Sequence, residues 1–213
     1  MNYEKLIFQM LDATQNTLLL FLVTLVFSLP LGMIICAGRR SKHWLVSLPF
    51  KLYILILRGT PLMLQLLFVF YALPPLFGIV VDRLPAAMIA FSLNYAAYFA
   101  EIYRGGIESV AVGQYEASQV LGLSRAQTFF RIVLPQVSKN ILPAMGNEFI
   151  TLVKDTSLAQ VIAVSELLKV TNDWVSSSTV MIPYVIAAAF YLIMNAVVTQ
   201  CFNVAEKRLS YYH

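Results

Sequence analysis

Four ionisable residues lie within apolar stretches of this sequence, where charged side chains are rare: Glu101, Glu148, Lys154 and Asp155. Charged groups at such depth are costly, so they normally pair with one another or line a water-filled cavity that a polar solute or ion can enter. Glu148 and Asp155 are seven residues apart and therefore share one face of a helix, while Lys154 points aside. The residue types indicate binding of a charged group rather than catalysis.

Two interpretations of these residues stay open at this point. Glu148 and Asp155 could line a polar cavity near the middle of the apolar layer. Alternatively, Lys154 could pair with one of them and only hold two helices together, because ion pairs of this kind serve both purposes. The sequence favours neither interpretation for the two carboxylates.

Other polar residues lie at the edges of the apolar stretches. Glu101 is close to the end of its stretch, so we expect it to pack with Arg104 or Arg58. Arg58 precedes Gly-Thr-Pro, where helical geometry breaks, and could form a gate. Extension of the Arg58 side chain toward the membrane interface is the favoured interpretation. Gln65 shares a face with Pro61 and could line the same cavity or bond across helices.

Composition indicates the environment of these residues. The 213 residues are 59% hydrophobic and 12% charged, with a mean hydropathy of +0.74. A soluble domain is about a quarter charged. The apolar residues form five blocks at about 17–37, 60–81, 84–103, 141–164 and 180–204. A spanning helix takes about 20 residues. We therefore expect an all-α, polytopic membrane protein with five transmembrane helices in one domain, residues 1–213, and an interfacial lead-in at 48–57.

The basic residues predict the orientation of these helices. With the N-terminus outside, ten of the fifteen Lys and Arg residues face the cytoplasm: Arg39, Arg40, Lys42, Lys51, Arg104, Arg125, Arg131, Lys139, Lys207 and Arg208. The outer segments hold only Lys5, Arg83 and Lys169. Cytoplasmic loops carry the excess of Lys and Arg, so the C-terminus is expected in the cytoplasm. The basic residues form no stripe interleaved with aromatic residues, and we expect no nucleic-acid partner.

The longest hydrophilic connection, about 104–139, is therefore expected in the cytoplasm. Apolar residues recur in it at roughly helical spacing, and glycines interrupt the pattern. The pattern predicts two short helices joined at Gly122-Leu123-Ser124, with Ser124 as the N-cap of the second helix. An amphipathic helix on this face usually docks against another protein.

This connection carries a specific motif. Glu116-Ala117-Ser118, then Gly122, then Ile-Val-Leu-Pro at 132–135 resembles the EAA loop of ABC importer permeases, with Ser118 in place of the third small residue. The resemblance implies a coupling helix, between the third and fourth transmembrane helices, that sits in a groove of an ATP-binding subunit. The residues expected to couple to the ATPase are Glu116, Ala117, Ser118, Gly122, Arg125 and Arg131. For the two arginines, a solvated basic face is the alternative.

Three more stretches are similar to the polar amino acid permeases, which import histidine, arginine, glutamine, glutamate, cystine and opines. They are Arg58 to Leu62 with Gln65, Ala97 to Ile107, and Asn147 to Ile150 followed by Lys154 to Leu158. The resemblance covers nearly the whole chain and implies a single type I ABC importer transmembrane domain. It implies a polar amino acid as substrate, bound by Glu148, Asp155, Lys154, Gln65 and Ser157.

The resemblance also implies the partners of the chain. They are two ATP-binding cassette subunits, a second permease subunit of the same or a homologous sequence, an extracytoplasmic solute-binding protein, the amino acid and membrane lipid, in the bacterial cytoplasmic (inner) membrane. The sequence has no Gly-x-x-x-x-Gly-Lys-Ser/Thr motif, so ATP and Mg²⁺ are expected on the ATPase partner. We expect a transport subunit rather than an enzyme, with no cofactor, metal or catalytic residue of its own.

Two alternatives belong to other classes. The first is a secondary amino acid transporter driven by ion coupling through Glu148 and Asp155. Such transporters usually contain repeated halves, and no repeat is evident here. The second is a purely structural membrane subunit in which the charges pair and nothing passes. Transport that depends on a separate ATPase would distinguish the importer from both.

Overall fold

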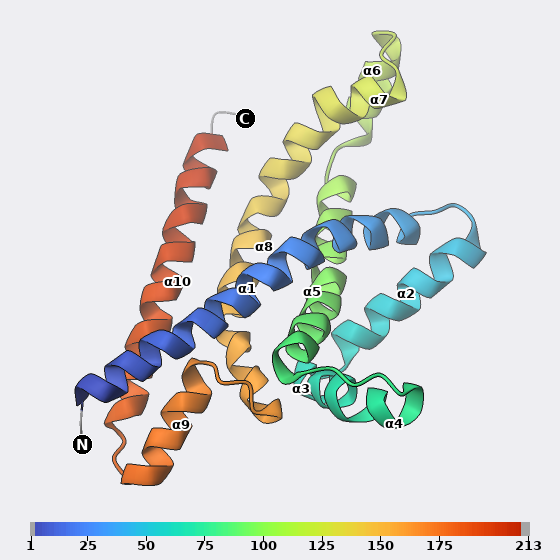
Figure 1. The fold of residues 1–213 in the computed structure, drawn as a ribbon. Helices are drawn as coiled ribbons and strands as arrows, with labels where there is room; N and C mark the ends of the chain where they lie inside the picture. The colour runs from blue at the N-terminus through green and yellow to red at the C-terminus, as the bar shows by residue number, and fades with distance from the viewer. Residues whose placement is uncertain (1–2, 210–213) are drawn as a thin grey trace.

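The computed structural model describes residues 3–209, and the regular elements of this range are all helical (Figure 1). The α-helices are α1 (Tyr3–Arg39), α2 (Trp44–Gly59), α3 (Leu62–Leu67), α4 (Leu73–Phe77), α5 (Arg83–Glu108), α6 (Val112–Val120), α7 (Arg125–Thr128), α8 (Leu134–Asp155), α9 (Leu167–Ser178) and α10 (Ile182–Leu209). Between them lie the π-helices η1 (Phe68–Ala72) and η2 (Phe129–Val133) and the 3-10 helix η3 (Thr156–Ile162). The predicted all-α fold is confirmed.

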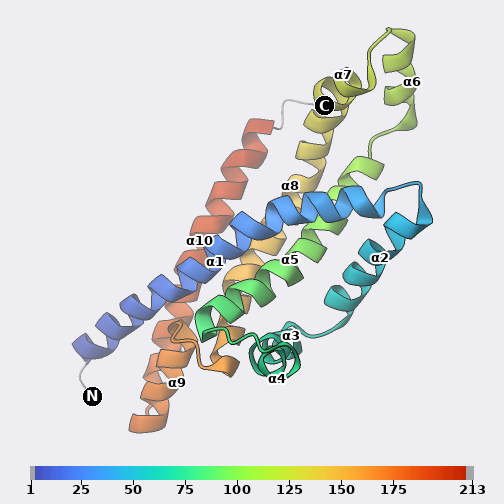
Figure 2. The same ribbon diagram turned by 45° about the vertical axis from the view of Figure 1, so that its right-hand side comes forward.

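The centre of the fold is the pairing of α1 with α5 (Figures 1 and 2). α5 buries a series of alanines: Ala86, Ala87, Ala90, Ala96, Ala97 and Ala100. Gly32 of α1 meets this helix so closely that an added Cβ would lie 3.0 Å from the Cβ of Phe99 and 3.1 Å from the carbonyl oxygen of Ala96. Small residues permit such an approach, which is how helices associate where lipid surrounds them. α1 therefore supports α5 along its length.

The second apolar block is not one continuous helix. α2 contains the expected lead-in at 48–57, and residues 62–77 form a helical segment bent by 107° from α2. Thr60 and Pro61 at the bend are both extended. Pro61 lacks an N–H group and disfavours a helical conformation of the residue before it, so the sequence itself ends α2 here. The two helical segments together form a broken span or a re-entrant loop, and a second span starting at Thr60 stays a prediction.

By length and apolar composition, two of the described helices could cross a membrane, α1 with 37 residues and α10 with 28, or three if the bent pair is one span. α5, with 26 residues, contains the third apolar block, while α8, with 22 residues, contains only residues 141–155 of the fourth, most of whose remainder is the 3-10 helix η3. Both contain ionisable residues, such as Glu101 and Glu148, which lower their apolar character. The helices are therefore present where expected, while the number of five spans stays a prediction.

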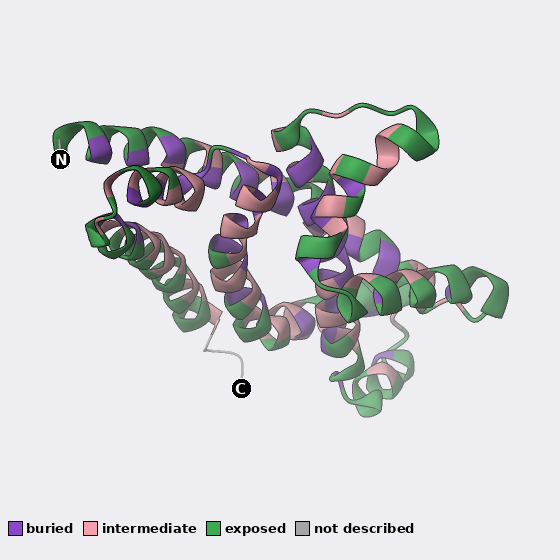
Figure 3. Cartoon of the chain, turned by 90° about the horizontal axis from the view of Figure 1, so that it is seen from below, coloured by how far each residue is buried: buried purple, intermediate pink, exposed green. Residues whose placement is uncertain are grey.

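Burial is uneven among the helices (Figure 3). Within the described range, α10 buries only Pro183 and Ala187. Its exposed apolar side chains include Val185, Leu192 and Ile193, which are 63–73% exposed. The three largest fully buried side chains, those of Tyr95, Phe91 and Phe99, lie instead on α5. An apolar face without cover suits contact with lipid tails or with another membrane subunit.

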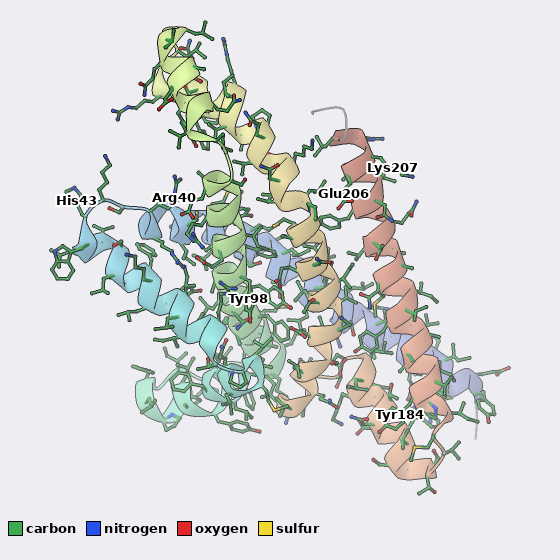
Figure 4. All side chains as sticks on the ribbon, turned by 180° about the vertical axis from the view of Figure 1, so that it is seen from behind. Arg40, His43, Tyr98, Tyr184, Glu206 and Lys207 are labelled. Atoms are coloured by element: carbon green, nitrogen blue, oxygen red, sulfur yellow. The ribbon has the colours of Figure 1, made fainter. Side chains whose placement is uncertain are left out.

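The two ends of the molecule differ in what they carry. α6 and α7 project at one end together with the last turns of α10, and the N-terminus and α9 lie at the other (Figures 1 and 2). Arg40, His43 and Lys207 lie toward the end with α6 and α7, and Tyr184 lies toward the opposite end (Figure 4). This arrangement agrees with the predicted separation of the termini.

The hydrophilic connection folds as its sequence predicts. α6 and α7 are joined at 121–124, where Gly122 has φ +73. Ser124 caps α7: its side chain accepts a hydrogen bond from the backbone N–H of Gln127, and the Gln127 side chain accepts one from the Ser124 N–H, at 2.8 Å. This reciprocal pair is a capping box. Residues 112–133 are called the coupling arm below.

Candidate functional site

A cavity of about 490 Å³ lies between the break after α2, the middle of α5 and the last turns of α8. Its lining consists of Arg58, Gly59, Thr60, Pro61, Leu62, Asn94, Tyr95, Tyr98, Glu148, Thr151, Asp155 and Leu158. Figure 4 shows Tyr98 on α5, midway between the coupling arm and the opposite end. The volume is in the range of small-molecule sites, about 300–1,000 Å³. The cavity therefore lies midway along the helices, and its size suits a small polar solute.

Glu148 and Asp155 both line this cavity, from the same face of α8. The buried hydroxyl of Tyr95 donates a hydrogen bond to Asp155 at 2.8 Å, which fixes that carboxylate. Within the described residues, Glu148 has no hydrogen-bond partner, and no ion pair joins Lys154 to either carboxylate. The geometry thus leaves negative charge facing the cavity.

Lys154 and Ser157 lie close by in sequence but outside the cavity lining. The Lys154 side chain is exposed, and the Ser157 hydroxyl donates to the Lys154 carbonyl oxygen at 2.7 Å. The structure therefore brings Glu148 and Asp155 together and leaves these two residues apart. Their contact with a substrate stays a prediction.

Gln65 holds the break in the helix. Its amide nitrogen donates to the carbonyl oxygens of Leu57 at 3.0 Å and Thr60 at 3.1 Å, and to the Thr60 hydroxyl at 2.9 Å. Asn94 of α5 donates to the Leu57 carbonyl oxygen and to the Gln65 side-chain oxygen, both at 2.9 Å. A broken helix at membrane depth needs such partners for its freed backbone groups. Gln65 is thus occupied within the chain, and its predicted contact with substrate is untested.

A second polar cluster adjoins the cavity. Glu101, whose side chain is 13% exposed, forms ion pairs with Arg39, with Arg104 at 3.0 Å and with Arg58 at 3.5 Å. Arg104 also pairs with Glu108. The prediction that Glu101 packs with Arg104 or Arg58 is confirmed, and Arg39 joins them. The cluster ties α1, α2 and α5 together at the side of the cavity nearer the coupling arm.

One buried carboxylate lies away from the cavity. Glu166 is fully buried and caps α9, accepting hydrogen bonds from the N–H groups of Leu168 at 2.8 Å and Lys169 at 2.6 Å. The Tyr191 hydroxyl of α10 donates to it at 3.1 Å. Burial raises the pKa of Glu166 to about 7. Because both of its oxygens accept hydrogen bonds, Glu166 is a structural link between α9 and α10, called the α9 junction below.

The coupling arm exposes most of the residues predicted to contact an ATPase. Glu116, Ala117, Gly122, Arg125 and Arg131 are exposed. Ser118 is the exception: its side chain is buried, and its hydroxyl donates to the Gln114 carbonyl oxygen at 2.6 Å. Its own carbonyl oxygen accepts from the Leu123 N–H at 3.0 Å, which closes the turn between α6 and α7. Ser118 therefore shapes the arm from inside.

Sequence reasoning missed several residues of these two sites. Asn94 and Tyr95 line the cavity from α5, and an Asn in the middle of an apolar block was the available signal. Val120 and Leu121 on the coupling arm are 88% and 76% exposed.

Comparison with known proteins decides the family. Residues 28–211 match the family described as "Binding-protein-dependent transport system inner membrane component". This chain belongs to that family. It is 38% identical over 198 residues to the L-cystine transport system permease protein TcyB of Bacillus subtilis, covering 92% of this chain and 84% of that protein. It is 39% identical over 195 residues to the octopine transport system permease protein OccM of Rhizobium radiobacter, covering 85% and 79%.

A solved structure supports the same assignment. The structure described as "Crystal structure of an amino acid ABC transporter with histidines" superposes with a TM-score of 0.89 at 32% sequence identity, covering 97% of this chain and 96% of that one. The predicted resemblance to polar amino acid permeases is confirmed.

These findings establish the role of the chain at the level of the family. It is the inner-membrane permease component of a binding-protein-dependent amino acid ABC importer, and is not itself an ATPase. Membership implies an ATPase and a binding protein as partners. The ion-coupled secondary transporter and the purely structural subunit are thereby set aside.

Proposed function

We propose that this permease takes a polar amino acid into the cavity between α2, α5 and α8 on its way across the membrane. The observation that carries the proposal is the pair of carboxylates, Glu148 and Asp155, which face a cavity at a broken helix. Transporters commonly bind their solutes near the membrane midplane where helices are discontinuous. An amino acid presents an ammonium group that two carboxylates can hold.

The class of substrate follows from the relatives rather than from the cavity. Related permeases are described as carrying L-cystine, octopine and arginine. These solutes differ in side chain and share an amino acid backbone. We therefore assign Glu148 and Asp155 to the ammonium group common to amino acids. Lys154, Ser157 and Gln65, placed at the edges of the cavity or behind it, are assigned to supporting contacts.

The proposed topology has five transmembrane helices, with the N-terminus outside and the C-terminus in the cytoplasm. Residues 1–213 then form a single type I transmembrane domain, and the connection at about 104–139 lies between the third and fourth spans. A second permease subunit, either another copy or a homologue, would cover the exposed apolar faces. The lack of cover on α10 supports such a contact.

The coupling arm is proposed to seat in one of two ATP-binding subunits, which hold the ATP and Mg²⁺. Its exposed apolar residues Val120 and Leu121 provide the contact area, and Arg125 and Arg131 provide charge. The capping box and the turn at Gly122 make the arm stiff enough to transmit movement of the ATPase to α8. The external binding protein would deliver the amino acid at the opposite end.

The test uses the purified complex of this permease with its ATPase in lipid nanodiscs. Binding of radiolabelled L-arginine, L-histidine, L-glutamine and L-cystine is measured for the wild type, Glu148→Gln and Asp155→Asn. We expect at least one amino acid to bind and each substitution to weaken it by roughly tenfold or more, since a hydrogen bond to a charged group is worth about 1.5–3 kcal/mol. Asp173→Asn is the matched control, because Asp173 is an exposed carboxylate outside the cavity. Unchanged binding in both carboxylate variants would contradict the proposal.

A further inference from the structure

A second pocket, of about 330 Å³, lies where the coupling arm joins the rest of the permease. Arg40, the first residue after α1, lines it from one side, and Ile107 lines it from the last turn of α5. The arm supplies the other side, including Arg125 at the start of α7. Figure 4 shows Arg40 toward the end of the molecule that carries the arm. The pocket therefore separates the arm from α1.

The two arginines of this pocket are without partners of opposite charge. Both are exposed, and within residues 3–209 neither side chain forms an ion pair or a hydrogen bond. The neighbouring Arg39 and Arg104, in contrast, both pair with Glu101. None of the described residues that line the pocket is acidic. Two guanidinium groups from different elements thus remain available to an anion, and their planar donor forks match the oxygens of a phosphate.

The rest of the pocket distinguishes between kinds of anion. Between the two arginines the lining includes the apolar side chains of Ile107, Leu123 and Phe129. A free phosphate ion gains nothing from an apolar wall, because its whole surface is hydrated. An amphiphile gains from both parts of the pocket, since its charged head meets the arginines and its hydrocarbon meets the apolar side chains. The lining therefore favours a lipid over a soluble anion.

The position of Arg40 supports the same choice. Trp44 and Leu45, which begin α2 a few residues later, are 67% and 68% exposed. Tryptophan is enriched at the level of the lipid headgroups, so this turn is expected at the membrane surface. Basic pockets between helices on the cytoplasmic side bind anionic headgroups.

We propose that this pocket binds the phosphate headgroup of an anionic phospholipid, which joins Arg40 to Arg125 and so ties the coupling arm to α1. A tied arm transmits the movement of the ATPase to the membrane helices with less loss. The inference rests on the proposed position of the arm at the cytoplasmic face and is independent of the amino acid cavity.

The first test measures lipid binding to the permease–ATPase complex. Native mass spectrometry reports how much phosphatidylglycerol and phosphatidylcholine the complex retains from mixed nanodiscs. We expect the wild type to prefer phosphatidylglycerol severalfold, and Arg40→Gln to weaken its binding by roughly tenfold. Arg40 carries the test because Arg125 is also assigned to the ATPase contact. Lys51→Gln is the matched control, because Lys51 is an exposed basic residue of α2 that does not line the pocket. Equal losses in both variants would show only general attraction to the membrane and overturn the inference.

The second test measures the consequence for transport. ATP-driven uptake of the radiolabelled amino acids named above is followed in liposomes of phosphatidylcholine with and without phosphatidylglycerol. Phosphatidylglycerol should raise uptake severalfold for the wild type and Lys51→Gln, and should have no effect on Arg40→Gln. Inorganic phosphate added to phosphatidylcholine liposomes should not replace it. If it does, the ligand is a soluble anion and the lipid assignment is wrong.

The outcomes separate this inference from the proposed function. Uptake that is the same in both lipids shows that the pocket has no such role, while the proposed function stands. If the complex shows the lipid preference and loses it in Arg40→Gln, but takes up no amino acid in any lipid, the proposed function fails and the lipid site stands.

A measurement on the wild type covers the case in which Arg40→Gln does not assemble. Phenylglyoxal modifies accessible guanidinium groups, and peptide mass spectrometry reports the extent at each arginine. Phosphatidylglycerol should protect Arg40 severalfold relative to phosphatidylcholine. Arg83, an exposed arginine that does not line the pocket, should be modified equally in both lipids. Equal modification of Arg40 in both lipids would overturn the inference.

Discussion

The cavity and the α9 junction each contain a glutamate withdrawn from bulk water. The two glutamates differ in whether the protein supplies hydrogen-bond donors to their carboxylates. At the junction, both oxygens of Glu166 accept hydrogen bonds, from two backbone N–H groups and the Tyr191 hydroxyl. In the cavity, Glu148 has no such partner within the described residues. A carboxylate that the fold satisfies contributes to the fold. One that the fold leaves unsatisfied is available to a ligand.

The largest expected effect tests this contrast directly. Glu166→Ala removes a helix cap and leaves two N–H groups and the Tyr191 hydroxyl without their acceptor, so we expect a loss of about 2–4 kcal/mol of stability. For a chain of this size that lowers the melting temperature by roughly 5–12 °C. Glu148→Ala should shift it by no more than about 2 °C. Thermal melting of the purified complex measures both, and equal losses would abolish the distinction.

The dependence of stability on pH should be carried by the junction. The folded-state pKa of Glu166 is raised by burial from its ordinary 4.5 to about 7. The folded protein therefore binds a proton more tightly than the unfolded chain. The contribution of Glu166 is fully present below pH 4.5 and is lost as the pH rises through 7. We expect the wild type to lose about 1–3 kcal/mol between pH 5 and pH 8.

The control for this pH dependence is Glu166→Gln, which cannot titrate. Its melting temperature should vary less between pH 5 and pH 8 than that of the wild type. A matching substitution at an exposed carboxylate of the same end, Asp173→Asn, controls for the loss of one negative charge there. Identical pH profiles for the wild type and Glu166→Gln would show that the junction does not titrate in this range.

Each region also contains a tyrosine that donates to a carboxylate, which gives a matched pair of substitutions. Tyr191→Phe takes a donor from Glu166 and should cost about 1 kcal/mol of stability with transport unchanged. Tyr95→Phe takes the donor from Asp155 and should raise the KM for transport severalfold with a smaller loss of stability. Transport assays and melting curves on both variants separate the two effects. If Tyr191→Phe instead impaired transport and Tyr95→Phe only lowered stability, the α9 junction would bind the solute and the cavity would be structural.

The last effect is expected outside both regions, on the coupling arm. Gly122 has φ +73 and open space around the position of an added Cβ. Gly122→Ala therefore costs only backbone strain, about 1–2 kcal/mol within the turn. We expect ATPase-dependent transport to fall severalfold while amino acid binding stays intact. Gly113→Ala, also in open space but without a positive φ, is the control and should transport normally.

How far the sequence could predict this structure depended on the range of the interactions. Local chemistry was sufficient for the coupling arm, since Gly122 and the Ser124–Gln127 capping box act within a few residues. It also indicated Glu148 and Asp155, whose shared helix face follows from their spacing. The bend at Pro61 was visible as a local signal, but its angle of 107° was not.

Partners distant in the chain could not be predicted in the same way. Asn94 bonds across 37 residues to Leu57, and Tyr95 across 60 residues to Asp155. These contacts depend on how α5 packs against α2 and α8. Periodicity identifies which face of a helix is apolar, but it does not identify the residue opposite. The burial of Glu166 was missed for the same reason, because its side-chain partner Tyr191 lies 25 residues away on α10.

The bond from Asn94 to the broken helix also bears on how the chain enters the membrane during synthesis. The Leu57 carbonyl oxygen already accepts a hydrogen bond from Gln65 of the same segment, but the Asn94 amide, costly in hydrocarbon alone, reaches both of them only when α2 and α5 are side by side. α2 leaves the ribosome first, yet its break is fully satisfied only after α5 has been made. We therefore expect insertion of residues 44–108 as one hairpin to cost less than insertion of its helices one at a time. The hydrogen bond from Asn94 to the break therefore couples the insertion of α2 to that of α5 during synthesis.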